Sequence, residues 1–276
     1  MVLQNNTEVA ASPNDGIDIY DIDIDSSTTT FSSILGAGKY LVCYFSAGSS
    51  ESYRSDIGCF NTKLGTGDYG CDYGGSFNDE YWLNTSSIEV RRIMQTRIAT
   101  AAQKGCSAID PDNIDVYGNK NGIGADQPNA IDFIQFLANE AHSRGMGIGL
   151  KNSIEILDNV SSIIDFAVNE ECVKNQECDG YKNFLATGAP VVNIEYPDQE
   201  TSNQTSFTGS EANSRCSTWK ALNMPKLATT LKGYPTVTCG VSRCITNANG
   251  NSAALPAVPA GGPLPIPAGC VDAPLS

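Results

Sequence analysis

Histidine and basic residues are scarce in this chain of 276 residues. His142 is the only histidine and no Cys-x-x-Cys pair occurs, so the donor sets that usually bind zinc are missing. Lysine and arginine number 17 against 31 acidic residues, and the net charge of -14 argues against nucleic acid or anionic membrane surfaces as partners. No apolar run is long enough to span a bilayer. We therefore predict no metal or other cofactor, no nucleic acid partner and no membrane insertion.

Cysteine, by contrast, is abundant. Ten cysteines are too many for an ordinary cytosolic enzyme and indicate an oxidising compartment. Three close pairs are predicted to form loop disulfides, each contributing roughly 2 to 4 kcal/mol: Cys59 with Cys71, Cys172 with Cys178, and Cys239 with Cys244. Cys216 and Cys270 have no obvious partner. Cys43 and Cys106 lie in apolar runs typical of strands, where free buried thiols are predicted as the alternative to disulfides.

Sequons support the same compartment. Asn-x-Ser/Thr occurs at four positions: Asn5, Asn84, Asn159 and Asn203. The chain opens on Met1-Val2-Leu3-Gln4 and continues into polar residues, without the apolar stretch of a signal peptide. We therefore expect a mature or truncated form of a secreted glycoprotein.

Short apolar segments alternate with amphipathic ones along the chain. Eight candidate strands lie near residues 2–4, 17–23, 40–45, 107–110, 146–150, 164–168, 190–195 and 226–230. The clearest helix follows a capping box at Ser86-x-x-Glu89 and stops at Gly105, and the next begins near Pro128 and stops at Gly145. Strand and helix in alternation predict a parallel sheet, either closed as a barrel or open and doubly wound. No glycine-rich dinucleotide fingerprint follows an early strand, which favours the α/β TIM (β/α)8 barrel.

Two segments depart from this alternation. Residues 51–85 hold glycines, aromatics and two cysteines, and are predicted to form a long ordered loop over the mouth of the barrel. Residues 245–276 consist largely of alanine, proline, glycine and asparagine and are predicted to form a loosely ordered tail. The predicted organisation is a barrel with disulfide-stapled loops over residues 1–244, followed by that tail.

Acidic residues stand where several candidate strands end. The four segments are Tyr20-Asp21-Ile22-Asp23, Asp110-Pro111-Asp112-Asn113, Asn169-Glu170-Glu171 and Glu195-Tyr196-Pro197. In a (β/α)8 barrel the carboxyl ends of all the strands meet at one mouth, where active sites lie. Two carboxyl groups facing one bond are the requirement for hydrolysis of a glycoside. The pattern therefore indicates a glycosidase. For any single acid, a role as a helix cap or a solvated side chain is the alternative.

Seven blocks in order resemble glycoside hydrolase family 114. They are Tyr44-Phe45-Ser46-Ala47-Gly48-Ser49, Trp82-Leu83-Asn84, Arg91 to Arg97, Asp110-Pro111-Asp112-Asn113, Gly149-Leu150-Lys151-Asn152, Phe166 to Cys172 and Val192 to Tyr196. The resemblance covers residues 17–197. It implies a TIM barrel with the activity of an endo-α-1,4-polygalactosaminidase, which acts on galactosamine-containing polysaccharide.

Asp112 and Glu170 are the predicted catalytic pair. Asp112 is assigned the role of nucleophile and Glu170 that of general acid and base, and the resembled family has its catalytic residues in these two blocks. Glu195, at another strand end, is the rival for the second role. Retention and inversion remain open, because they depend on whether the two carboxyl groups lie about 5 to 5.5 Å or about 6.5 to 9.5 Å apart.

Further polar and aromatic residues near the strand ends are predicted to bind substrate. They are Asp21, Tyr44, Ser46, Asn113, Tyr117, Lys151, Asn152 and Tyr196. Lys151 could keep Asp112 or Glu170 ionised or donate to a sugar oxygen, or it could form a purely structural ion pair. The acidic balance suits a polymer of deacetylated galactosamine, whose ammonium groups pair with carboxylates.

Two other classes of protein fit part of this pattern. A secreted carbohydrate-binding barrel without catalysis would use the same mouth, and a structural wall or secreted protein would use the barrel only as a scaffold. An aligned pair of carboxyl groups distinguishes the enzyme from both, since a binding protein needs no proton donor at a scissile bond.

Overall fold

The computed structural model describes residues 2–3, 18–61, 67–74, 79–198, 207–232 and 242–243. The predicted tail over residues 245–276 lies outside these ranges. So do the predicted pair Cys239 and Cys244 and two of the four sequons, Asn5 and Asn203.

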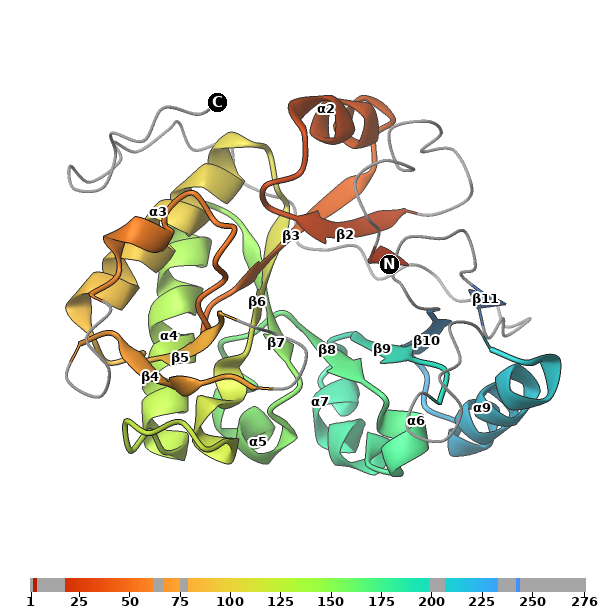
Figure 1. Ribbon diagram of the computed structural model, residues 1–276. Coiled ribbons are helices and arrows are strands. Elements are labelled where there is room, and N and C mark those ends of the chain that lie inside the picture. The colour runs from red at the N-terminus through yellow and green to blue at the C-terminus, as the bar shows by residue number, and fades with distance from the viewer. Residues whose placement is uncertain are drawn as a thin grey trace.

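Eight parallel strands form the central sheet and follow one another in chain order. They are β1 (Val2–Leu3), β2 (Ile19–Asp23), β3 (Tyr40–Ser46), β6 (Ala108–Asp112), β7 (Gly147–Lys151), β8 (Phe166–Glu170), β9 (Val191–Glu195) and β10 (Leu227–Leu231). A short antiparallel strand, β11 (Ser242–Arg243), follows β10. Figure 1 shows the sheet curling round toward a barrel. All eight predicted strands and the α/β barrel topology are confirmed; in the residues described, no pairing joins β1 to β10.

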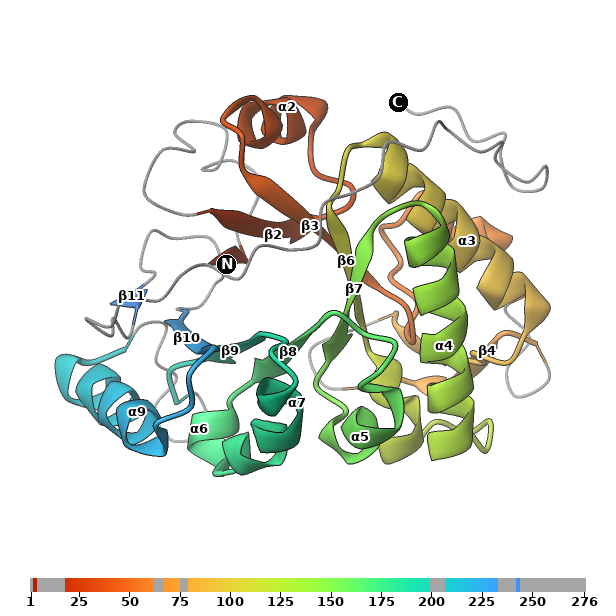
Figure 2. The ribbon, with the colours of Figure 1, turned by 180° about the vertical axis from the view of Figure 1, so that it is seen from behind.

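Helices cover the outer face of the curled sheet. They are α2 (Thr28–Gly36), α3 (Ile88–Gln103), α4 (Gln127–Ser143), α5 (Leu157–Val160), α6 (Cys172–Asn175), α7 (Lys182–Ala186) and α9 (Gly209–Leu222). Seen from the two sides in Figures 1 and 2, α3 and α4 lie outside β6 and β7. None of the helices in the described ranges is long and apolar enough to cross a membrane.

The two helices predicted from the sequence are present, with one correction. The capping residue of α3 is Ser87, whose hydroxyl accepts a hydrogen bond from the amide of Glu89, so the predicted capping box at Ser86 is wrong. The helix begins one residue later because Ser87 has the extended backbone that a capping position needs. Asp126 forms a complete capping box at the start of α4.

Alternation along the strands creates two separate apolar cores. Residues facing outward pack against the helices and form the larger one. The inward-facing side chains of Val42, Ala108, Phe166, Val168 and Ile194 form a smaller core inside the curl. Toward the carboxyl ends of the strands, the inward positions become polar and charged. The mouth of the curled sheet is therefore polar, and the smaller apolar core lies directly beneath it.

In the parts that the structure describes, the segment between β3 and α3 forms an ordered insertion. It contains an antiparallel hairpin of β4 (Tyr69–Asp72) and β5 (Tyr81–Leu83). The rings of Tyr73 and Trp82 stack with centroids 4.5 Å apart, and the Tyr73 hydroxyl donates to Asn113 in the turn after β6. The hairpin thus reaches the carboxyl edge of the sheet.

The cysteine pairing differs from the prediction in two places. Cys172 and Cys178 form the predicted disulfide. Cys43 and Cys106, for which free thiols are the predicted alternative, form a disulfide between β3 and the start of β6, because these neighbouring strands bring the two residues together on the outer face.

Cys71 is free, so the predicted pair of Cys59 with Cys71 is wrong. Cys59 and Cys216 are each disulfide-bonded.

Candidate active site

Three neighbouring strands end in a charged side chain followed by a left-handed residue. Asn113, Asn152 and Glu171 come directly after β6, β7 and β8 and have φ angles of 61°, 49° and 66°. This backbone conformation is uncommon outside glycine, although asparagine tolerates it comparatively well. It turns the chain sharply away from the sheet at each of the three ends.

Lys151, the last residue of β7, lies at the centre of the mouth. Its ammonium nitrogen is 3.3 Å from Asp112 Oδ2 and 3.7 Å from Glu170 Oε2, and its side chain is only 3% exposed. Burial alone would lower the pKa of Lys151, but the charges of Asp112, Glu170 and Asp110 raise it well above its ordinary value. Lys151 is therefore a permanent cation between the two predicted catalytic carboxylates.

Asp112 is held from the neighbouring strand as well. The hydroxyl of Tyr44, on β3, donates to Asp112 Oδ2 at 3.0 Å. Burial and the negative charge of Asp112 both raise the pKa of Tyr44 well above its ordinary value, so the phenol keeps its proton and remains a donor. Asp112 thus accepts from one neutral and one cationic donor, which fixes its orientation.

Two side chains donate hydrogen bonds to the carboxylate of Glu170. Tyr196 donates its hydroxyl to Oε1 at 2.7 Å, and Asn152 donates its amide to Oε2 at 3.1 Å while accepting from the Glu170 backbone at 2.8 Å. Burial opposes ionisation, but the Lys151 charge and these hydrogen bonds outweigh it and lower the pKa of Glu170 below its ordinary value. The site without substrate therefore holds Glu170 as a carboxylate.

The shared lysine limits the separation of the two carboxylates. One nitrogen lies 3.3 Å from one oxygen and 3.7 Å from the other, so these oxygens are at most about 7 Å apart. That limit includes the separation typical of retaining glycosidases and only the lower end of the inverting range. Two carboxyl groups at this spacing can face one glycosidic bond.

A hydroxyl and amide network supports the turn beside Asp112. Asn113 donates to Ser46 Oγ at 2.8 Å and to Ser49 Oγ at 3.1 Å, and Ser49 in turn donates to Glu80 at 3.3 Å. Ser46 and Asn113 were predicted to bind substrate; their side chains bond to each other at the mouth. Tyr117, predicted likewise, bonds instead to Glu155 at 2.9 Å, on the exposed rim.

Glu195 does not belong to this group. The register pairs Glu170 with Ile194, so Glu195, one residue further, points to the opposite face of the sheet. Its carboxylate accepts from the amides of Val173 and Lys174 in α6 and lies 3.4 Å from Arg215. Glu195 binds the amino end of a helix on the outside of the sheet, which corrects its prediction as a catalytic rival at the mouth.

Asp21 is also placed differently from its prediction. It points into the curl with 0% exposure, as does Asp110, and so lies beneath the mouth rather than on a surface that a sugar can reach. Asp110 stands two residues before Asp112 on the same face of β6. From the sequence, Asp110 was considered only as a residue that could cap the following segment. Its position two residues before Asp112 is the signal that its side chain points to the same, inner face of the sheet.

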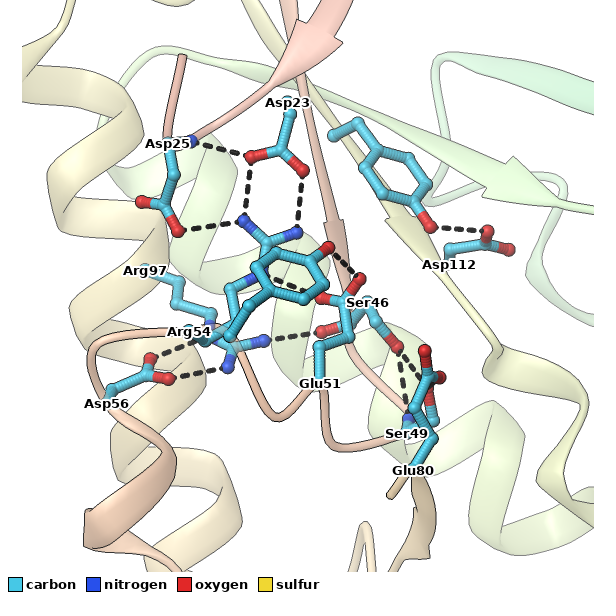
Figure 3. A network of polar contacts seen from close by, with 12 residues as sticks. Asp23, Asp25, Ser46, Ser49, Glu51, Arg54, Asp56, Glu80, Arg97 and Asp112 are labelled. Atoms are coloured by element: carbon cyan, nitrogen blue, oxygen red, sulfur yellow. Dashed lines mark hydrogen bonds and ion pairs between the residues drawn. The ribbon is translucent and has the colours of Figure 1, made fainter. Parts of the chain in front are cut away.

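An arginine clamp that the sequence did not reveal holds the adjoining loop (Figure 3). Arg54 is 2% exposed and donates to Asp23 through two bonds of 2.7 and 2.8 Å, to Asp25 at 2.9 Å and to Glu51 at 2.7 Å. The loop of residues 47–61 has no periodic pattern, so no sequence signal marks Arg54. The clamp ties that loop to the end of β2.

A second arginine continues the clamp. Arg97, from α3, forms two bonds of 2.7 Å with Asp56 and donates to the carbonyl of Ser46 at 2.7 Å. Figure 3 shows the Arg97 guanidinium between Asp56 and Ser46, with Asp112 farther to the right. The two arginines together connect β2, β3 and α3 around the mouth.

Two further charged residues face the mouth. Burial and the charge of Glu51 raise the pKa of Glu80 to about 7. Lys232 follows β10 directly and lies near Glu170, Lys151 and Asp21; burial lowers its pKa. Lys151 was predicted from the sequence because it is a charged residue at a strand end. Lys232 shows the same signal and could have been predicted in the same way. Across the described chain, no group of three or more histidine, cysteine, aspartate or glutamate side chains is arranged to hold a metal ion.

Comparisons with known proteins show which family and which solved structures the chain is similar to. The model of glycoside-hydrolase family GH114 matches residues 2–243. The crystal structure of Aspergillus fumigatus Ega3 in complex with galactosamine is 38% identical in sequence, with a TM-score of 0.74, and the match covers 88% of this chain and 92% of Ega3. A comparison with curated proteins finds no match.

A more distant structure shares the fold. The glycoside hydrolase domain of PelA from Pseudomonas aeruginosa is 13% identical, with a TM-score of 0.60, and the match covers 88% of this chain and 96% of that domain. At this identity the likeness concerns the fold alone.

Proposed function

The chain belongs to glycoside hydrolase family GH114 and is a glycoside hydrolase; from this we propose that it cleaves α-1,4 linkages in a galactosamine-containing polysaccharide, with Asp112 and Glu170 as its catalytic carboxylates. One observation carries the assignment of residues. Lys151 holds both carboxylates around a single ammonium group at the carboxyl edge of the sheet, within the spacing that glycosidases use.

The reaction proceeds in two balanced steps. Asp112 attacks the anomeric carbon as the bond to the leaving oxygen breaks, and the carboxyl group of Glu170 gives that oxygen its proton. Glu170, now a carboxylate, takes a proton from water, whose oxygen displaces Asp112 from the anomeric carbon. Hydrolysis by this route retains the anomeric configuration.

The positioning groups divide between the two carboxylates. Tyr44 and Lys151 both contact Asp112 Oδ2 and fix the orientation of this carboxyl group, as a positioned nucleophile requires. Asn152 and Tyr196 orient Glu170 from either side. Glu170 must carry a proton when the substrate binds. Because the pKa of Glu170 is lowered, we expect this protonated form, and therefore activity, at acidic pH.

The charge of the mouth supports an amino sugar as the substrate. Glu51, Asp23 and Asp25 surround the single guanidinium of Arg54, so this part of the rim has an excess of carboxylates. An ammonium group on a deacetylated galactosamine ring would pair with that excess. The complex of Ega3 with galactosamine supports the same class of sugar. Because exposed charges are screened by ions, binding of the polymer is expected to weaken as salt rises.

Release of reducing ends from a partly deacetylated α-1,4-galactosamine polymer tests the proposal. We expect Asp112→Asn and Glu170→Gln each to lower kcat by at least about 10³-fold, because each removes a group that reacts. Glu171→Gln is the matched control, since Glu171 is one residue from Glu170 and pairs with Lys174 instead.

Three outcomes would overturn the assignment. Full activity in both variants would remove these residues from catalysis, and binding of the polymer without any cleavage by the wild type would favour a carbohydrate-binding barrel. Loss of activity in Glu195→Gln, with Glu170→Gln still active, would return the second role to Glu195.

Secretion is part of the same proposal. The disulfides Cys43–Cys106 and Cys172–Cys178 support an oxidising compartment. Immunodetection of the protein in culture medium rather than in washed cells is the expected result, and its confinement to the cells would contradict the proposal.

A further inference from the structure

Two aspartates inside the curl have no hydrogen-bond partner in the part of the chain that the structure describes. Asp21 on β2 and Asp110 on β6 are both 0% exposed, and all four of their carboxylate oxygens are unpaired. Burial of a carboxylate without a hydrogen bond is costly, and native proteins rarely leave such groups unmatched. The pair therefore needs a physical explanation.

The two side chains form a layer beneath the catalytic carboxylates. Asp110 pairs in register with Tyr44, and Asp21 pairs with Val42 on the same strand, so both carboxyl groups point toward the inside of the curl. The charged and titratable groups that face Asp110 are Asp21, Tyr44, Asp112, Lys151 and Glu170. Those that face Asp21 are Asp110, Lys151 and Lys232.

Burial and mutual repulsion both oppose two negative charges here. Burial and the charge of Asp110 raise the pKa of Asp21 well above its ordinary value. Burial raises the pKa of Asp110 to about 6, with Lys151 opposing the shift and Asp112 adding to it. Two neighbouring carboxyl groups titrate as a unit. One proton between them lets one carboxyl group donate a hydrogen bond to the other, which satisfies one oxygen of each.

We propose that Asp21 and Asp110 share one proton and act as a positioning pair beneath Lys151. Asp21 carries the proton and donates it in a hydrogen bond to the Asp110 carboxylate. The single remaining negative charge faces Lys151 from below, opposite Asp112 and Glu170 above. This inference rests on the proposed function of the mouth, which it deepens by assigning a role to the layer under it.

The pair has a specific effect on catalysis. The Lys151 cation is shared among three carboxylates, so Glu170 experiences only part of its charge. Without the Asp110 charge, Lys151 would act more strongly on Glu170 and lower its pKa further. The proton that Glu170 must donate would then be available only at lower pH, although neither aspartate touches the substrate.

Three variants separate this role from a merely structural one. Asp21→Asn replaces a protonated carboxyl by an amide that can still donate to Asp110, so kcat/KM and the pH profile are expected to stay within about twofold of the wild type. Asp21→Leu fills the space without a donor and leaves Asp110 to take up the proton itself. Asp110→Asn removes the charge directly. The last two are expected to lower kcat/KM by about tenfold and to move the basic limb of its pH profile to lower pH.

The results that would overturn the proposal are equally specific. If Asp21→Asn is as impaired as Asp21→Leu, Asp21 works as an ionised carboxylate. If Asp110→Asn leaves the basic limb in place, the pair does not act on Glu170.

A readout without substrate keeps this test independent of the proposed function. The infrared difference spectrum between the wild type and Asp21→Asn is expected to show the carbonyl band of a buried protonated carboxyl that only the wild type has; the subtraction removes the contribution of Glu80, whose pKa of about 7 leaves it partly protonated at neutral pH. Absence of the band in the wild type would refute the shared proton even if the enzyme cleaves the polymer. Its presence together with no turnover would instead count against the proposed function alone.

Discussion

Two charged networks lie side by side at the carboxyl edge of the sheet, and they are built in opposite ways. In the arginine clamp, Arg54 makes four bonds of 2.7 to 2.9 Å to three carboxylates, two of them to Asp23 in a forked geometry. In the lysine cluster, one ammonium reaches Asp112 at 3.3 Å and Glu170 at 3.7 Å, while the carboxyl groups of Asp21 and Asp110 below it accept from no N–H or hydroxyl group among the described residues.

The difference separates a scaffold from a reactive site. A guanidinium stays charged at any ordinary pH and fixes carboxylates through a rigid fork, so the clamp has a single arrangement. An ammonium with longer contacts to several acids leaves their protons free to redistribute. We conclude that the clamp positions the loop over residues 47–61 and that the lysine cluster performs the chemistry.

Removal of Lys151 should give the largest effect. Lys151→Met is expected to lower kcat by at least about 10²-fold, because the cation that orients both carboxylates is lost. It should also move the basic limb of the pH profile to higher pH, since Glu170 no longer faces a positive charge. Measurement of kcat/KM against pH checks both.

Lys182→Met is the matched control, because Lys182 forms an exposed pair with Asp179. A Lys151→Met enzyme with wild-type kcat and an unmoved limb would show that this lysine serves only the fold.

Loss of the clamp should change stability more than turnover. Arg54→Met leaves Asp23 and the buried Glu51 without their partner, and the free energy of unfolding is expected to fall by about 3 kcal/mol. Urea unfolding followed by fluorescence measures this loss. Arg92→Met, which breaks an exposed pair with Glu89, should change it by less than about 1 kcal/mol. Equal losses in the two variants would contradict the role assigned to the clamp.

The pH profile of the wild type gives the finest distinction. The basic limb should report Glu170, the proposed acid, whose pKa lies below its ordinary value because Lys151 and the hydrogen bonds to Glu170 outweigh the effect of burial. Because Glu170 must be protonated to act as the acid, kcat/KM is expected to fall as pH rises through the acidic range. A profile measured from about pH 3 to 8 tests this. A limb near 7 would point instead to Glu80, whose pKa is raised to about 7.

The fold was predictable because its strongest signals are local. Each of the eight strands is a short apolar run, and strands buried on both faces in a parallel sheet produce that pattern. The helices after Ser87 and Asp126 carry their own capping residues. The Cys43–Cys106 disulfide was missed because its partners are 63 residues apart, and only the pairing of the strands brings them together.

The site was predictable in part for a different reason. Asp112, Lys151 and Glu170 all occupy inward positions at the ends of neighbouring strands. Glu195 also ends a strand, but a shift of one residue relative to Glu170 reverses its direction, and sequence alone does not give the register between strands. Arg54 lies in an irregular loop, so only the folded chain shows that it reaches Asp23.

Turnover and stability of Asp112→Asn and Arg54→Met, measured on the same preparations, test the contrast most directly. We predict that Asp112→Asn has no detectable turnover but loses less stability toward urea than Arg54→Met, because the amide oxygen still accepts from Tyr44 and Lys151 keeps its ion pair with Glu170. Arg54→Met should unfold at lower urea yet keep turnover per folded molecule within about tenfold of the wild type. An active Asp112→Asn, or an Arg54→Met that is stable but inactive, would contradict the account.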